Sequence, residues 1–309
     1  MAVDPISNLL FQPFSHKIGE DEAIVRPNTT YWQDVWYRLK QNKGAIAGLV
    51  IVIIMIVMAI IGPYLTPYSY DTQNLAAEFT NQPPSSEHWF GTDDLGRDLF
   101  TRVWHGARVS LLIGFLSALV QFVIGVTYGG ISGYIGGWVD EVMMRIVEIL
   151  SGIPFLLYVI LLMVILEPGL NTILIALGVV YWLSMARLVR GQVLALKEQE
   201  YVLAARALGA SQWRIIFRHL IPNCMGPILV YSTLAIPEAI FAEAWLSFLG
   251  LGVSAPQASL GMLVSDGIGA IRLYPYQLFF PAFFISLTIL AFNILGDGLR
   301  DALDPRLRK

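Results

Sequence analysis

The feature that most constrains this chain is an uninterrupted apolar run, AIAGLVIVIIMIVMAII, over residues 45–61. About 20 apolar residues are enough for a helix to cross the hydrocarbon core of a bilayer. The whole chain of 309 residues is 56% hydrophobic and 14% charged, whereas water-soluble domains are typically about 25% charged. This composition excludes an ordinary water-soluble enzyme and indicates a membrane protein.

Further apolar stretches follow the first, separated by charged or proline-rich segments. The predicted spans are 45–61, 109–131, 149–166, 170–185, a fifth that begins after Pro222 and is interrupted at Pro237, and 278–295. The stretch 241–252 is apolar but contains Glu243, so it is compatible with a helix, a loop or a re-entrant segment. We therefore expect an all-α, polytopic membrane protein with six transmembrane helices.

Lys and Arg are distributed unevenly among the segments that join these spans. Segments 1–43 and 187–222 and the tail after residue 296 hold 15 of the 20. Short cytoplasmic loops are enriched in these residues, so we predict all three segments, and both termini, on the cytoplasmic side. The chain then divides into a cytoplasmic segment 1–43, a first span 44–66, an acidic extracytoplasmic segment 67–106 and a five-helix core 107–309. The net charge of −3 gives no basic field that would attract nucleic acid.

Glycines recur at steps of four in the second predicted span. Gly125, Gly129 and Gly133 share one helical face, as Gly137 does if the helix continues that far. Small residues on one face let a second helix approach closely, so we expect helix packing there. A hinge at Gly130 and Gly133 is the alternative.

Two acidic residues fall within predicted apolar segments. Glu238 and Glu243 are candidates for a transport pathway, because an ionisable side chain at membrane depth is costly unless it has a function or a partner. The four histidines all lie outside the predicted spans, which argues against ion coupling. Glu148 follows Arg145 by three residues, and an ion pair along one helix face explains both.

Catalytic motifs are not found. A phosphate-binding loop of the G-x-x-x-x-G-K-[ST] type needs a Lys after Gly, and none of the five lysines follows one. The segment DDLGRD, Asp93 to Asp98, lacks the spacing of a calcium loop and is better explained as a turn fastened by Asp side chains. We expect no cofactor or metal on this chain and no ATP hydrolysis by it. Cys224, the single cysteine, has no partner for an internal disulfide.

The 187–222 segment contains two short helical patterns joined at Gly209. Ser211 is placed to cap the second pattern, which we expect to end before Pro222. Small side chains, including Ala204, Ala205 and Ala207, occupy the first. A DNA-reading helix-turn-helix has a similar layout but fits poorly between two membrane spans, and an amphipathic helix lying on lipid headgroups is a further alternative.

At these residues the chain resembles a known family. Leu203 to Pro222 is similar to the EAA loop of permease subunits of binding-protein-dependent ABC importers, with Ala204, Ala205, Gly209 and Pro222 matching its spacing. Leu203 replaces the usual Glu, and His219 stands where Ile is common. Four longer stretches resemble the C-type permease subunit of oligopeptide and dipeptide importers: WQDVWYRLKQNKGAIAGL (32–49), HWFGTDDLGRDLFTRVWHGARVSL (88–111), AWLSFLGLG (244–252) and NILGDGLRDALDPRLRK (293–309).

The resemblance implies a type I ABC importer permease fold in a prokaryotic inner or plasma membrane. It also implies partners: a second homologous permease subunit, two P-loop ATPase subunits and an extracytoplasmic peptide-binding protein, besides membrane lipid. The ATPases would contact the loop at Leu203, Ala204, Ala205, Arg206, Gly209 and Pro222. The acids of the outer segment and its aromatics Trp89, Phe90 and Trp104 favour a docking surface for the binding protein, with anchoring of these aromatics at the membrane surface as the alternative. The competing hypothesis is an ion-coupled carrier or a membrane signalling receptor.

Overall fold

The computed structural model describes residues 30–254 and 256–304, which form helices and loops with one isolated β-bridge, Thr92 to Asp98. An all-α fold is therefore confirmed for this part of the chain. The elements are α1 (Tyr31–Gln41), α2 (Lys43–Ile61), the 3₁₀ turn η2 (Gly62–Tyr64), α3 (Leu99–Ile135), α4 (Gly137–Ser151), α5 (Phe155–Leu166), α6 (Leu170–Leu196), α7 (Glu200–Ala207), α8 (Gln212–Arg214), the π-helical turn η3 (Ile215–Leu220), α9 (Ile221–Asn223), α10 (Met225–Phe248), α11 (Leu260–Ala270) and α12 (Tyr276–Leu303).

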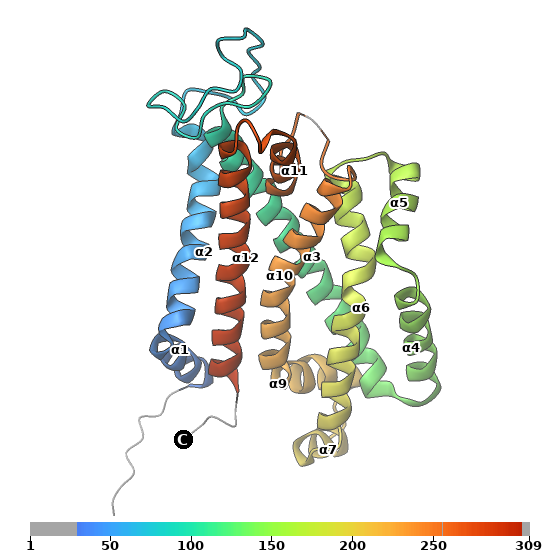
Figure 1. Ribbon diagram of the computed structural model, residues 1–309. Coiled ribbons are helices and arrows are strands. Elements are labelled where there is room, and N and C mark those ends of the chain that lie inside the picture. Colours follow the sequence, from blue (N-terminus) through green and yellow to red (C-terminus); the bar gives the residue numbers. More distant parts are fainter. Residues whose placement is uncertain (1–29, 255, 305–309) are drawn as a thin grey trace, which may run out of the picture.

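Five of these helices are long and apolar enough to cross a membrane, namely α2, α3, α6, α10 and α12. The pair α4 and α5 makes a sixth span if it is counted as one element. In Figure 1, α2 and α12 stand side by side at one edge of the bundle, α4 and α5 form the other edge, and α3, α6 and α10 lie between them.

The expectation of one continuous helix over 149–166 is wrong, because α4 and α5 are bent by 80° relative to each other. The break contains Gly152, Ile153 and Pro154. Proline has no N–H for the helical ladder, and it disfavours helical backbone in the residue before it. A new helix starts directly afterwards, where the Leu157 N–H donates to the Pro154 carbonyl at 2.9 Å.

The predicted interruption at Pro237 is also wrong, since α10 is continuous from Met225 to Phe248. Pro237 is buried inside the bundle, and neighbouring helices stabilise proline-containing spans. Beside it, Gly114 of α3 lets Ile236 approach so closely that a Cβ at Gly114 would lie 2.9 Å from Ile236 Cγ2. The ambiguous stretch 241–252 is helix as far as Phe248 and loop beyond it.

Helix ends account for most other differences from the predicted spans. The second span begins at Leu99 rather than near Val109, because the Asp98 carboxylate accepts the Thr101 N–H at 2.8 Å and caps α3. The fourth continues to Leu196, so the first part of the predicted 187–222 loop is helix. The short helix α11 was not predicted.

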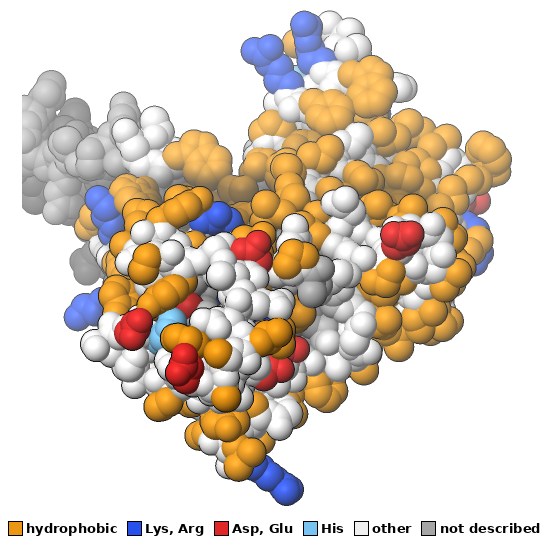
Figure 2. All heavy atoms as spheres, turned by 90° about the horizontal axis from the view of Figure 1, so that it is seen from above, with side chains coloured by type: hydrophobic (Ala, Val, Ile, Leu, Met, Phe, Trp, Pro, Cys, Tyr) orange, Lys and Arg blue, Asp and Glu red, His pale blue; other side chains and the backbone are white. Residues whose placement is uncertain are grey.

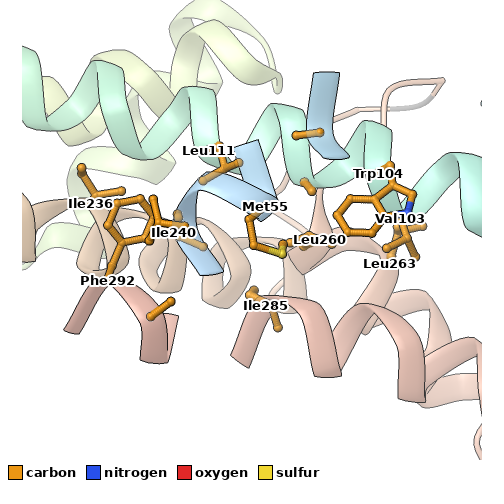
Figure 3. Close-up of a cluster of buried hydrophobic side chains, with 14 of the residues drawn as sticks. Met55, Val103, Trp104, Leu111, Ile236, Ile240, Leu260, Leu263, Ile285 and Phe292 are labelled. Atoms are coloured by element: carbon orange, nitrogen blue, oxygen red, sulfur yellow. The ribbon is translucent and has the colours of Figure 1, made fainter. Parts of the chain in front are cut away.

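One apolar core joins α2, α3, α10, α11 and α12. Figure 3 shows Met55, Trp104 and Ile240 among its side chains, with Leu260 of α11 and Phe292 of α12 nearby. A second cluster packs α5 and α6 on α3 and α10. α1 packs separately on the end of α12 through Val35, Leu39 and their apolar neighbours.

The two ends of the bundle differ in what they carry. Figure 1 places α1, α7 and the end of α12 together, which we call the α7 end. Residues 65–98, which we call the cap, lie with α11 at the opposite end. The three basic segments thus share one side, as predicted, within residues 30–304. Lys17, Arg26, Arg306, Arg308 and Lys309 lie outside the described residues.

Candidate functional site: the α7–α9 segment and the polar groups of the spans

Gly209 forms the sharp turn between α7 and α8. Its φ of +79° is in the left-handed region that favours glycine, and a Cβ there would meet no atom within 4 Å. The Gly209 N–H donates to the Arg206 carbonyl at 3.0 Å, and the Ala210 N–H donates to the Ala205 carbonyl at 3.0 Å. Glycine is therefore needed here for its backbone conformation and not for lack of space.

Apolar side chains fasten this segment to the spans. Val202 of α7 and Ile215, Ile216 and Leu220 of η3 are buried with Val193 of α6 and other apolar residues of α3, α6 and α10. The Arg206 guanidinium lies 5.7 Å from the centre of the Tyr134 ring of α3. The segment that contains α7 is therefore packed against both α3 and α6.

The outer face of the same segment is apolar and exposed. Leu208 is 88% exposed, and Leu203, Trp213 and Phe217 are exposed beside it. Ala204 is also exposed, whereas Ala205 is half-buried against the apolar cluster. An exposed apolar surface of this kind is typical of a protein interaction site.

The second helical stretch does not end before Pro222, contrary to the prediction. The Ile221 N–H donates to the Ile216 carbonyl in the wider π register, and helix then continues through Pro222 to Asn223. Pro222 is thus the second residue of α9, which begins directly after the π-helical turn. Ser211 caps the stretch as expected, accepting the Arg214 N–H at 3.4 Å.

The structure places the two acidic candidates differently. The Glu243 carboxylate is fully buried and accepts hydrogen bonds from Ser110 (3.3 Å), Ser247 (2.7 Å) and Ser259 (2.5 Å). These serines come from α3, α10 and the start of α11, so Glu243 joins three elements. Glu238 is exposed on α10, and among the described residues its carboxylate accepts no hydrogen bond and makes no ion pair.

The three glycines of α3 face α6 at very short range. A Cβ at Gly125 would lie 2.6 Å from Met185 Cβ, and one at Gly133 would lie 2.9 Å from the Arg190 carbonyl oxygen. A Cβ at Gly129 would collide with the Ala186 carbonyl oxygen. The backbones of α3 and α6 therefore touch where these side chains are missing.

The cap is built around its aspartates. Asp93 accepts the backbone N–H groups of Leu95 (3.0 Å) and Arg97 (2.9 Å), and its second oxygen accepts Arg97 Nε at 2.7 Å. This is the turn predicted for DDLGRD. Farther out, a hydrogen bond from Ser69 lowers the pKa of Asp71, so that carboxylate stays charged. Figure 2 shows acidic side chains over this end of the molecule, with hydrophobic side chains around the sides.

Comparison with known proteins shows which family this chain belongs to. Residues 125–309 match the family described as binding-protein-dependent transport system inner membrane component. The chain belongs to this family. Residues 30–84 also match the N-terminal transmembrane domain of oligopeptide transport permease C. The chain is therefore a multi-pass membrane protein of the ABC importer permease family.

Its relatives are peptide permeases. The dipeptide transport system permease protein of Bacillus subtilis is 57% identical over 294 residues, covering 95% of this chain and 91% of the relative. The oligopeptide transport system permease protein of the same species is 54% identical over 300 residues, covering 97% and 98%. The corresponding Escherichia coli K12 protein is 45% identical over 287 residues, covering 93% and 95%.

A solved structure supports the fold. Inward-facing conformations of the MetNI methionine ABC transporter match with a TM-score of 0.54 and 20% sequence identity. The match covers 64% of this chain and 94% of that chain. The type I importer permease fold, expected from sequence, is therefore shown for the larger part of this permease.

One polar cluster was missed by the sequence analysis. Arg190 of α6 donates two hydrogen bonds of 2.6 Å to Asp140 of α4, which also accepts the Ser132 hydroxyl of α3 at 2.5 Å. The cluster holds the α3–α4 turn against α6, near α7. The signal in the sequence was weak, because Asp140 stands beside a second acid, Glu141, and its partner lies 50 residues away. The predicted Arg145–Glu148 pair is present at 2.7 Å.

Proposed function

We propose that this chain is a pore-forming permease subunit of an ATP-driven peptide importer and forms half of the translocation path. The observation that carries the proposal is the match to dipeptide and oligopeptide permeases over nearly the whole chain, at 57% and 54% identity. The five or six candidate spans provide enough membrane-crossing structure for such a role.

Coupling to ATP is assigned to the α7–α9 segment. Two separate ATPase subunits would contact Leu203, Ala204, Ala205, Arg206 and Gly209, with Pro222 at the end of the segment. The exposed apolar face around Leu203 and Leu208 suits a docking groove, and the buried anchors to α3 and α6 would carry the motion of the ATPases into the spans. With Leu203 in place of Glu, this contact is apolar rather than an ion pair.

The same proposal gives the chain a location and an orientation in the membrane. The α7 end and both termini face the cytoplasm of a prokaryotic cell, and the cap faces outward from the inner or plasma membrane. The distribution of Lys and Arg supports this orientation. A peptide-binding protein would dock on the acidic cap, and a second, homologous permease subunit would complete the path within the lipid.

The chain itself is proposed to be non-catalytic and to bind no cofactor or nucleic acid. It has no Gly-Lys sequence of the kind that holds nucleotide phosphates. ATP hydrolysis then takes place on the separate ATPase subunits, and this subunit converts their motion into opening of the path.

Reconstitution in lipid vesicles tests the proposal. The chain and its second permease are assembled with and without the ATPases, and phosphate release and uptake of a labelled peptide from its binding protein are followed. Uptake that needs ATP and the ATPases supports the proposal. Uptake driven by a proton gradient alone would favour an ion-coupled carrier, and ligand-dependent signalling without uptake would favour a receptor.

A further inference from the structure

One face of α10 is left uncovered by the rest of the described chain. The stripe consists of residues at alternating steps of four and three along the helix: Pro227, Tyr231, Leu234, Glu238, Phe241, Trp245 and Phe248. Each of these side chains is exposed or half-exposed, whereas Ala235, Ala239 and Ala242 on the opposite side are buried. Glu238 is the only charged member of this stripe, and it lies near the middle of the helix.

A groove leads toward Glu238 from the α7 end. It has a volume of about 450 Å³ and lies between α6, α10 and α12, with Leu188, Tyr231 and Leu234 in its lining. Leu234 is one helical turn from Glu238 on the same face. The stripe thus continues the groove from one end of the bundle toward the middle of the spans.

Polar side chains of α6 line the same side of the molecule. Tyr181 of α6 packs against the apolar cluster that contains Ala239 and Ala242 of α10, and Tyr231 lies two helical turns before Glu238 on the stripe. Ser184, one turn along α6 from Tyr181, is exposed. Two helices therefore place a carboxylate, two phenols and a hydroxyl along one surface of otherwise apolar spans.

The surroundings of Glu238 show what this surface faces. A carboxylate that pointed into lipid would carry a large desolvation penalty, which is why acids at membrane depth face a bundle interior or a water-filled path. Glu243, five residues along α10, is stabilised by three serine hydroxyls. Glu238 has no such partners within residues 30–254 and 256–304, so its carboxylate is available to a cation that comes from outside the chain.

We propose that Glu238 binds the N-terminal ammonium group of the peptide during its passage. This inference rests on the proposed peptide-import function. The α-ammonium is the cation that every unmodified peptide has, whatever its side chains, so one carboxylate can hold diverse peptides. The apolar side chains on either side of Glu238 in the stripe, the half-exposed Leu234 and the exposed Phe241, leave apolar surface for the first side chain.

The first experiment measures uptake by the complete reconstituted importer carrying Glu238→Gln. We expect peptide uptake per ATP hydrolysed to fall about tenfold, because a charge-assisted hydrogen bond is lost, and Glu238→Asp to restore most of it. The matched control is Glu148→Gln, which removes an exposed acid of α4 that is paired with Arg145, and it should transport normally. Wild-type uptake per ATP by Glu238→Gln would overturn the inference.

The second experiment reports which end of the peptide lies near residue 238, and it does not depend on how well Glu238→Gln transports. Phe241→Cys, exposed on the stripe three residues from the intact Glu238, is made in a Cys224→Ser background. The variant is offered two peptides with free termini, each loaded on the binding protein, with a thiol-reactive side chain at the first or the last residue. We expect several-fold more cross-linking from the first residue. Equal cross-linking from both, or none, would overturn the inference.

A third measurement shows whether Glu238 binds a cation of the peptide or a cation on the second permease subunit. If Glu238 is paired across the subunit interface, Glu238→Gln weakens copurification of the two permeases, and that outcome overturns the inference. Unchanged copurification supports it. Failure of the wild-type complex to import peptide would instead refute the proposed function, so the two failures are distinguishable.

Discussion

Single residues in this permease act through backbone conformation or through buried hydrogen bonds. Gly209 and Glu243 are the clearest examples. At Gly209 the positive φ disfavours ordinary residues although the space around it is open. At Glu243 one carboxylate organises donors from α3, α10 and the loop before α11.

Substitution of Gly209 should reduce coupling without removing the protein from the membrane. A left-handed conformation costs a non-glycine residue about 1 kcal/mol, so Gly209→Ala should lower ATP-driven uptake, and Gly209→Trp should abolish it by blocking the docking face. Gly191→Ala is the control, since a Cβ there also meets no atom within 4 Å and the backbone is helical. Normal uptake by a well-expressed Gly209→Trp variant would contradict the coupling role of α7.

Loss of the Glu243 carboxylate should destabilise the protein. Glu243→Leu leaves three serine hydroxyls without their shared acceptor, and a buried unsatisfied group costs about 1–3 kcal/mol. Thermal unfolding in detergent should show a clear drop in midpoint. Glu238→Leu, on the same helix but without hydrogen-bond partners in the described chain, should leave the midpoint unchanged, and equal losses from both variants would refute a structural role specific to Glu243.

At the scale of elements, the contact between α3 and α6 depends on missing side chains. Gly129→Ala should distort this contact, because its Cβ meets the Ala186 backbone, which cannot move away as a flexible side chain can. Overpacking of this kind typically costs about 1–3 kcal/mol. Gly130→Ala is the matched control, since its Cβ would lie 3.2 Å from the flexible end of Ile221. Thermal unfolding should separate the two variants, and similar midpoints would contradict close packing at Gly129.

The elements differ in how well the sequence predicts them. Long apolar runs predict α2, α6 and α12 because hydrophobic length directly determines which segments cross a bilayer. The effect of a proline is less predictable: Pro154 breaks a helix at a loosely packed bend, whereas Pro237 is held inside a continuous one by its neighbours. The sequence pattern around each proline contains no information about such neighbours.

The functional residues were also predictable only where the local sequence determines the feature. Gly209 was predictable because one residue is responsible for the turn. The Glu243 and Asp140 clusters were not, because their partners lie up to 133 and 50 residues away in the chain. Nor does the sequence distinguish Glu238, which is exposed, from Glu243, which is buried.

At the scale of the whole molecule, the two ends of the bundle differ in charge. The acidic cap, fastened to α12 by the hydrogen bond from Gln277 to Asn81 at 2.8 Å, is at one end. α1, α7 and the end of α12, in segments rich in Lys and Arg, are at the other. Since positively charged loops are retained in the cytoplasm, we expect the cap outside and α7 inside.

Cysteine labelling checks this orientation, and the native thiol should not interfere. Cys224 is buried, and burial raises the pKa of its thiol to about 11, so little reactive thiolate exists at neutral pH. Ser86 is exposed on the cap and Glu198 is exposed between α6 and α7. In a Cys224→Ser background, Ser86→Cys should react with a membrane-impermeant maleimide on intact cells freed of any outer barrier. Glu198→Cys should react only after the cells are opened. The reverse pattern would place the α7 end outside, where no cytoplasmic ATPase could reach it, and would refute both the orientation and the proposed coupling.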